Sequence, residues 1–302
     1  MSVPLSFLRS SAPPAHVALG RWVADRLVES PQIATLLDCL CSTQNPAIYA
    51  PDASQRALTH EHLRSFISTF VLPHSPTHIP IGPNDRVLVA LPNGPLNAAA
   101  ILAIACYHTC APVNASCTSS ELRDDAKRLG IKVIVSSKDS VERLGLISLQ
   151  EELGCDVILL EPQPDGPAGL FNMECLDRQS IFPSQPSQPH TLDDLSLVLQ
   201  TSGTSGKKKV VPYSLRALIV GAWAVVQSWA LREQDVNCKN NQWLTVMTET
   251  NMHSVNMMPL FHVGGFVRNL CAPMLSGGST IVCGGFDALA FWSVARQLGA
   301  TW

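Results

Sequence analysis

The sequence predicts an α/β fold in which a mostly parallel sheet is flanked by helices, and three observations lead to this prediction. Short apolar runs alternate with longer helical segments, in the order strand, helix, helix, strand between residues 85 and 137. Strands that are buried on both faces and joined by helices are typical of parallel pairing. Hydrophobic residues make up 46% of the 302 residues and charged residues 15%, which is sufficient for a large core.

The first predicted elements lie between residues 56 and 108. Residues 56–70 indicate a turn and then an amphipathic helix, with Thr59 as its N-cap. The apolar face of that helix comprises Leu63, Phe66, Ile67 and Phe70. The apolar run 85–92, closed by Pro92, predicts a buried strand, and residues 94–108 predict a largely buried helix.

Later segments continue the alternation. Residues 118–130 predict an exposed helix that Ser119 or Ser120 caps and Gly130 ends. Strands are expected within 131–137 and 153–162, and a long apolar helix, capped by Ser214, over 214–231. The stretch 162–194 carries six prolines, so we expect a surface connection there and not core. The large apolar side chains expected in the core of the C-terminal half are Trp223, Trp229, Met257 and Met258.

Charge and cysteine content exclude several classes of protein. The chain has 24 acidic and 21 basic residues, so it presents no general attraction for nucleic acid or anionic membrane. Its ten cysteines form no CxxC pair, which favours buried, reduced thiols in an intracellular protein. The longest apolar run, 98–106, is too short to span a bilayer. We therefore expect a cytoplasmic protein, with a peroxisomal C-terminal address left open.

His60 and His62 lack further metal ligands nearby, and a solvated helix or strand start is favoured for them.

Residues 200–214, QTSGTSGKKKVVPYS, combine two glycines, several hydroxyl side chains and three lysines. Glycines allow backbone N–H groups to converge on an anion, and hydroxyls and lysines suit phosphate oxygens. By composition alone, a phosphate-binding loop and a polar hairpin turn are about equally favoured. The run has neither Walker A nor Rossmann spacing. It also misses the G-x-S-x-G nucleophile elbow, because Lys207 stands at the final position.

The same loop resembles the phosphate-binding signature of the adenylate-forming enzymes, which include acyl- and aryl-CoA ligases and nonribosomal-peptide-synthetase-like adenylation domains. Lys209 and Val211 fall on the family's lysine and valine, whereas Lys208 replaces its proline and Val210 a glycine. The residues that match the start of the signature are Thr201, Ser202, Gly203, Thr204, Ser205 and Gly206. Residues 57–63, 103–122 and 256–265 are similar to other family motifs, and the resemblance covers about residues 55–302.

The resemblance implies ATP-dependent activation of a small carboxylic acid to an acyl-adenylate, followed by transfer to a thiol. Coenzyme A and the phosphopantetheine of a carrier domain are the alternative thiol acceptors. Residues 201–206 would bind the β- and γ-phosphates of ATP together with Mg²⁺, and no protein ligand for the metal is assigned. Lys209 would offset phosphate charge, and His262 would border the carboxylate pocket. Lys209 and His262 are therefore the two candidate catalytic residues.

The chain also departs from the family pattern. We divide it into a lead-in, 1–54, and a partial adenylation domain, 55–302, without the C-terminal lid domain. Residues 237–255 match no family element, and a translated intron and a genuine surface insertion both explain them. Motifs that bind Mg²⁺ and ribose in the family are not found, so we expect a truncated chain with impaired activity. The alternatives are a non-catalytic pseudo-enzyme that binds at most nucleotide phosphate and, less favoured, a serine hydrolase that uses Ser205.

Overall fold

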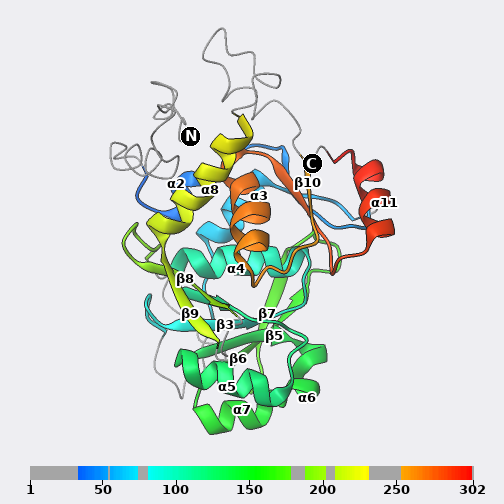
Figure 1. Cartoon of the computed structure of the whole chain (residues 1–302). Coiled ribbons are helices and arrows are strands. Elements are labelled where there is room, and N and C mark those ends of the chain that lie inside the picture. The colour runs from blue at the N-terminus through cyan, green and yellow to red at the C-terminus, as the bar shows by residue number, and fades with distance from the viewer. Residues whose placement is uncertain are drawn as a thin grey trace.

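The computed structural model describes residues 33–53, 55–73, 81–177, 188–201, 208–230 and 253–300. These residues form two sheets with helices between and around them (Figure 1). The larger sheet has the strand order β7-β6-β5-β3-β4-β8-β9, and the smaller has the order β10-β11-β1-β2. The strands of the larger sheet are β3 (Arg86–Ala90), β4 (Thr109–Pro112), β5 (Val133–Ser137), β6 (Asp156–Pro162), β7 (Phe171–Cys175), β8 (Leu195–Thr201) and β9 (Lys209–Ser214). Those of the smaller sheet are β1 (Pro46–Tyr49), β2 (Leu58–Thr59), β10 (His253–Asn256) and β11 (Ser279–Val282).

The larger sheet is parallel at its centre and antiparallel at both edges. Strand β3 pairs in parallel with β4 and β5, and β8 and β6 extend the parallel pairing outward. The edge strands β7 and β9 run antiparallel to their neighbours. Because helices cover both faces, the central strands are almost continuously buried, as the apolar runs predicted. The predicted α/β fold with a mostly parallel sheet is confirmed.

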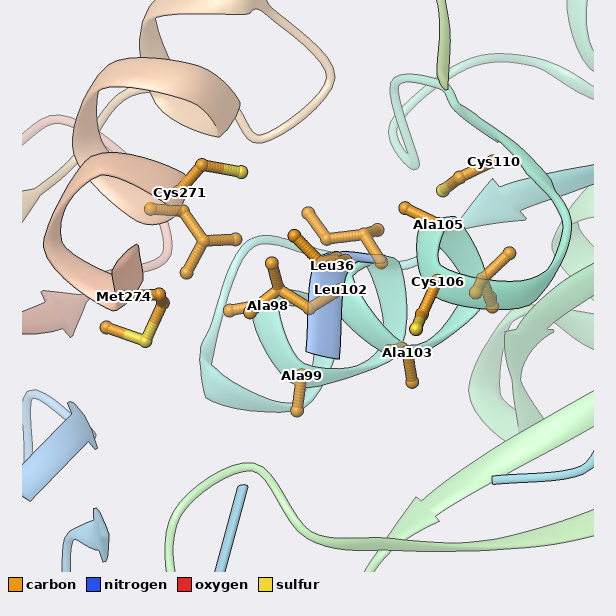
Figure 2. Packing of buried hydrophobic residues seen from close by; sticks show 14 of the residues in the cluster. Leu36, Ala98, Ala99, Leu102, Ala103, Ala105, Cys106, Cys110, Cys271 and Met274 are labelled. Carbon is orange, nitrogen blue, oxygen red and sulfur yellow. The ribbon is translucent and has the colours of Figure 1, made fainter. Parts of the chain in front are cut away.

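Helix α4 (Pro95–Tyr107) lies between the two sheets (Figure 1). Every residue from Asn97 to Tyr107 is buried, which explains why this helix has no polar face. Figure 2 shows its small side chains, Ala98 and Ala99 among them, between Cys271 and Met274 at one end and Cys110 at the other. Alanines permit this close approach on all sides, because a larger side chain would need space that the packed interior does not have.

Helix α5 (Ser119–Leu129) covers the opposite face of the larger sheet, together with α6 (Val141–Leu144) and α7 (Leu146–Leu153). Its N-cap is Thr118, whose hydroxyl accepts from the Glu121 N–H while the Glu121 carboxylate accepts from the Thr118 N–H. The expected caps, Ser119 and Ser120, are therefore wrong by one or two positions, because the capping box requires a glutamate three residues after the cap. Gly130 ends the helix at φ 58°, as predicted.

The other helical segments complete the described structure. Thr59 caps α3 and Ser214 caps α8, and both roles agree with the sequence patterns. The remaining helical segments are α2 (Leu36–Cys39), α3 (His60–Ser68), η2 (Lys138–Ser140), α8 (Leu215–Ala230), η4 (Gly264–Cys271), α10 (Ala272–Ser276) and α11 (Ala288–Leu298). Segment η4 is π-helical, and the Ala272 N–H at its end donates to the Val267 carbonyl five residues back.

Three segments contribute more to the fold than the sequence patterns suggested. Within the predicted connection 162–194, β7 adds a strand whose Phe171 and Cys175 are buried, so this part is not only a surface connection. Strand β1, from the predicted lead-in, pairs with both β2 and β11. Strand β10 begins at His253, inside the predicted insertion 237–255. The rest of that insertion, residues 237–252, lies outside the described residues.

Several side chains that the sequence singled out have an ordinary structural role. Trp223 and Met257 are buried as expected, whereas Met258 is 42% exposed and is not core. His60 is also buried, with Nε2 2.8 Å from the Gly278 carbonyl oxygen, so the solvated start expected there is wrong for this residue. The nine described cysteines are free thiols, and all but Cys41 are buried. No helix in the described part of the chain is both long and apolar enough to cross a bilayer.

Candidate phosphate and carboxylate site

The predicted phosphate loop connects β8 to the edge strand β9, with which β8 is paired. Strand β8 ends at Thr201 and β9 begins at Lys209, and these two residues are direct partners across the antiparallel pair. The loop therefore starts and ends at the carboxyl edge of the parallel strands, where ligands of open α/β sheets bind. Five predicted loop residues lie outside the described residues: Ser202, Gly203, Thr204, Ser205 and Gly206. Their phosphate contacts stay a prediction, as does the hydrolase role of Ser205.

Alternation along the hairpin places Lys209 and Lys208 on opposite faces of the sheet. Leu199 belongs to the core formed with α4 and α8, and its partner on β9 is Val211. Residues two positions apart share a face, so Thr201 and Lys209 lie on this same side of the sheet. Lys209 is exposed. Its ammonium group and the Thr201 hydroxyl are thus donors of the kind that a phosphate requires.

Lys208 belongs to the other face, which α5 covers. Its Nζ lies 2.6 Å from Oδ2 of Asp125, a carboxylate only 3% exposed. Arg128 approaches Oδ1 of the same carboxylate at 3.3 Å and donates from Nη1 to Gln200 Oε1 at 3.1 Å. Gln200 precedes Thr201 on β8, so the network joins α5 to both strands that border the loop.

The turn that carries His262 is held by hydrogen bonds from an asparagine in the larger sheet's β3–α4 connection. Asn93 Nδ2 donates to the Met258 carbonyl at 3.0 Å, and Asn93 Oδ1 accepts from the Leu260 N–H at 3.0 Å. Both polar atoms of one side chain thereby fix the backbone two to four residues before His262. Sequence reasoning missed Asn93, although its position directly after a buried parallel strand could have indicated it.

Asn256 fixes the same turn from its other side. Its Oδ1 accepts from the Met258 N–H at 3.1 Å, and its Nδ2 donates to the Gly265 carbonyl at 3.2 Å. A Cβ on Gly265 would lie 2.2 Å from the Pro259 carbonyl oxygen, so only glycine permits the close approach of these two backbone segments. The turn is therefore specified at several points, and the π-helical segment η4 follows it directly.

His262 is exposed at the end of this turn, and its ring packs on Phe261 with 4.5 Å between ring centroids. The core that contains Leu199 also contains Leu260 and Phe266, so the turn lies on the same side of the larger sheet as Lys209. Among the described residues, no hydrogen bond or ion pair joins Lys209 to His262. The structure thus places the two candidate catalytic residues on one side of the sheet without bringing them into contact.

Two other observations bear on the site's chemistry. No group of three His, Cys, Asp or Glu side chains within the described ranges could hold a metal ion. A surface depression of about 630 Å³ lies elsewhere, between α3 and the β6–β7 turn, and its lining includes Arg56, His62 and Phe66 but neither Lys209 nor His262. At the loop itself, the described side chains that can donate to an anion are the Thr201 hydroxyl and the Lys209 ammonium.

Known proteins that are similar to this chain are CoA ligases. The chain is 28% identical over 258 residues to the sulfoacetate–CoA ligase of Cupriavidus necator, covering 85% of this chain and 45% of that enzyme. It is 28% identical over 234 residues to the probable CoA ligase CCL9 of Humulus lupulus, covering 74% and 39% respectively. The chain thus spans less than half the length of these curated relatives.

Solved structures show the same fold. An acyl-CoA synthetase from Brucella canis superposes with a TM-score of 0.63 at 20% identity, covering 95% of this chain and 50% of that one. MatB from Rhodopseudomonas palustris, without ligand, gives a TM-score of 0.62 at 18% identity and covers 86% and 46%. The described fold therefore corresponds to a portion of these longer adenylate-forming ligases.

A family model described as AMP-binding enzyme matches residues 77–302. The match includes the 201–209 loop, the Asn93 connection and the His262 turn. This chain belongs to the AMP-binding enzyme family.

Proposed function

We propose that the Thr201–Lys209 loop and the His262 turn form the ATP-phosphate and carboxylate parts of an acyl-CoA-ligase site. The reaction is activation of a carboxylic acid to an acyl-adenylate with release of pyrophosphate, followed by thioester formation. The observation that carries the proposal is the pairing of Thr201 with Lys209 at the carboxyl edge of the sheet, on the side of the His262 turn. The family match supplies the chemical class.

The proposed roles follow from the donors that each residue presents. The Lys209 ammonium offsets charge on the β- and γ-phosphates, which leave as pyrophosphate, and the Thr201 hydroxyl donates to a phosphate oxygen. Mg²⁺, when bound, would neutralise phosphate charge. His262 borders the acid pocket from the turn after β10, and Asn93 and Asn256 hold the backbone of that turn on either side of His262. Coenzyme A is the proposed thiol acceptor, with a carrier-bound phosphopantetheine as the alternative.

The chain spans less than half the length of the curated relatives that it matches. We propose that these 302 residues by themselves bind nucleotide but catalyse poorly. The first test is calorimetric titration with Mg·ATP of the unmodified chain, Lys209→Ala and Lys132→Ala. Lys132 is an exposed lysine beside the amino end of β5, at the opposite edge of the same sheet, and its removal changes the net charge equally. We expect Lys209→Ala to weaken binding at least about tenfold and Lys132→Ala to leave it unchanged.

The outcomes separate the proposal from its alternatives. Equal affinity of all three proteins would refute the role of Lys209, and no saturable binding by the unmodified chain would refute the nucleotide site as a whole. ATP–pyrophosphate exchange is measured on the same samples. Saturable binding with weak exchange agrees with the proposal, whereas rapid exchange would refute the proposed impairment. Labelling of Ser205 by a serine-reactive phosphonate would favour a hydrolase instead.

A further inference from the structure

We propose that Lys208 is a positioning residue that fixes the carboxyl end of the phosphate loop by pairing with Asp125, and that it is not a phosphate ligand. The proposal rests on the proposed function for the identity of the ligand, but its structural part can be tested without nucleotide. It separates two neighbouring lysines that composition alone would assign to one anion site.

Direction is the first observation. Lys208 Nζ lies 2.6 Å from Asp125 Oδ2, and Asp125 is on α5, below the face opposite to that of Lys209 and Thr201. A lysine held on that face cannot also reach an anion on the other side of the strand. The phosphate contact therefore belongs to Lys209.

Burial of the carboxylate is the second observation. Asp125 is 3% exposed, and a buried carboxylate without a cationic partner is strongly unfavourable. Lys208 and Arg128 are the two cations beside it, at 2.6 and 3.3 Å. Asp125 is on a packed helix, so its position is fixed. The attraction therefore holds Lys208 and the strand end beside it in place.

The network reaches both ends of the loop, which is the third observation. Arg128 also donates to Gln200, one residue before Thr201, so α5 contacts β8 through Arg128 and the residue just before β9 through Lys208. The six residues 202–207 between these two anchors carry the predicted phosphate donors. Anchored flanks reduce the motion of the donors at Thr201 and Lys209, so less ordering is needed when an anion binds there, and binding is correspondingly tighter. At this position a proline would supply rigidity through its ring, and here an ion pair supplies it.

The test is a double-mutant cycle on Mg·ATP affinity with Lys208→Met, Asp125→Asn and the double variant. If Lys208 acts through Asp125, we expect each single variant to weaken binding about tenfold and the double variant to be no weaker than either. A direct phosphate ligand would lower the affinity by the same factor in both backgrounds, and that result would overturn the proposal. Lys208→Arg, which keeps the cation, is expected to restore affinity.

The matched control is Lys127→Met, which removes a lysine from the same helix. Lys127 pairs with Glu152 at 2.5 Å, and no hydrogen bond or ion pair joins it to the described residues of the β8–β9 hairpin. We expect its affinity for Mg·ATP to equal that of the unmodified chain. If Lys127→Met weakens binding as much as Lys208→Met, the effect comes from α5 stability in general and the proposal is wrong.

Hydrogen exchange without nucleotide keeps the proposal testable if the chain does not bind ATP. Lys208→Met is expected to speed amide exchange about tenfold in peptides that cover 195–214, and Lys127→Met is expected to leave it unchanged. Absence of ATP binding together with this difference would refute the proposed function and support the anchoring. Normal ATP binding without any exchange difference would refute the anchoring and leave the proposed function standing.

Discussion

Asn93 offers a direct test of how the His262 turn is held. Replacement by alanine removes both hydrogen bonds from the turn backbone, each with a 3.0 Å donor–acceptor distance. A protein hydrogen bond of this kind contributes about 1 kcal/mol net, so losing both bonds should destabilise the closed turn by about 2 kcal/mol relative to the unmodified chain. That corresponds to a change of about 30-fold in the equilibrium between the open and closed turn.

Amide hydrogen exchange measures this equilibrium at the Leu260 N–H, which is one of the two lost partners. We expect exchange at Leu260 to be about 30-fold faster in Asn93→Ala, while amides in β3 and β5 keep their protection. Asn172→Ala is the control, because Asn172 is exposed on the edge strand β7 and, in the described part of the chain, its side chain accepts one long hydrogen bond, 3.5 Å from Gln163 Nε2. A folded Asn93→Ala protein with unchanged exchange at Leu260 would refute the reasoning.

The other predictions concern the backbone, the core and the titrating groups. Gly265→Ala places a Cβ 2.2 Å from the Pro259 carbonyl oxygen, so it should lower the free energy of unfolding in urea by more than about 2 kcal/mol. The control is Gly284→Ala, whose Cβ has open space around it and which should leave that free energy nearly unchanged. Trp223→Ala should cost about 3–5 kcal/mol because the side chain is fully buried, and Trp292→Ala, at a site that is 70% exposed, should cost less than about 1 kcal/mol by the same measurement. Burial lowers the pKa of His60 and of His108, so the folded state binds fewer protons than the unfolded state. The folded state should therefore be most stable above the unfolded histidine pKa of about 6.5 and lose stability as the pH falls below that value. In thermal unfolding, His60→Gln should reduce this loss of stability at low pH. Burial also raises the pKa of the Cys106 thiol to about 12 and that of the Cys155 thiol to about 11. Both thiols should therefore react with a thiol reagent at pH about 8 only after the chain is unfolded. Rapid labelling of the folded protein would contradict this.

Much of the fold could be predicted because its central elements carry strong local patterns. The buried strands β3, β5 and β6 are short apolar runs, and α4 is an unbroken apolar helix. Strand β7 was missed because its residues are partly polar and follow a Pro- and Gly-rich turn, and only pairing with β6 makes it a strand. Similarly, His253 begins β10 through parallel pairing with Ser279, which is distant in sequence.

The site was predictable only where a motif is local. The loop between Thr201 and Lys209 and the turn at His262 are contiguous in sequence, so resemblance could locate them. Asn93 acts on the turn from a position 165 residues earlier than Met258, and Asp125 acts on Lys208 across 83 residues. The position of Asn93 after a buried strand could have indicated that residue, but a single sequence does not show which distant residue it binds. Asp125, within a helix, resembles any other polar helical residue.

The lysine run shows why the composition of a loop does not define its site. In solution, three neighbouring lysines would act as one diffuse positive charge. On an extended strand, consecutive side chains point to opposite faces, so Lys208 and Lys209 enter different environments although they are adjacent. Lys208 meets a buried carboxylate, whose charge it compensates, and Lys209 remains exposed on the side of the His262 turn. If one of the two binds phosphate, the pleat of β9 assigns that role to Lys209, and the cost of leaving Asp125 unpaired keeps Lys208 from replacing it.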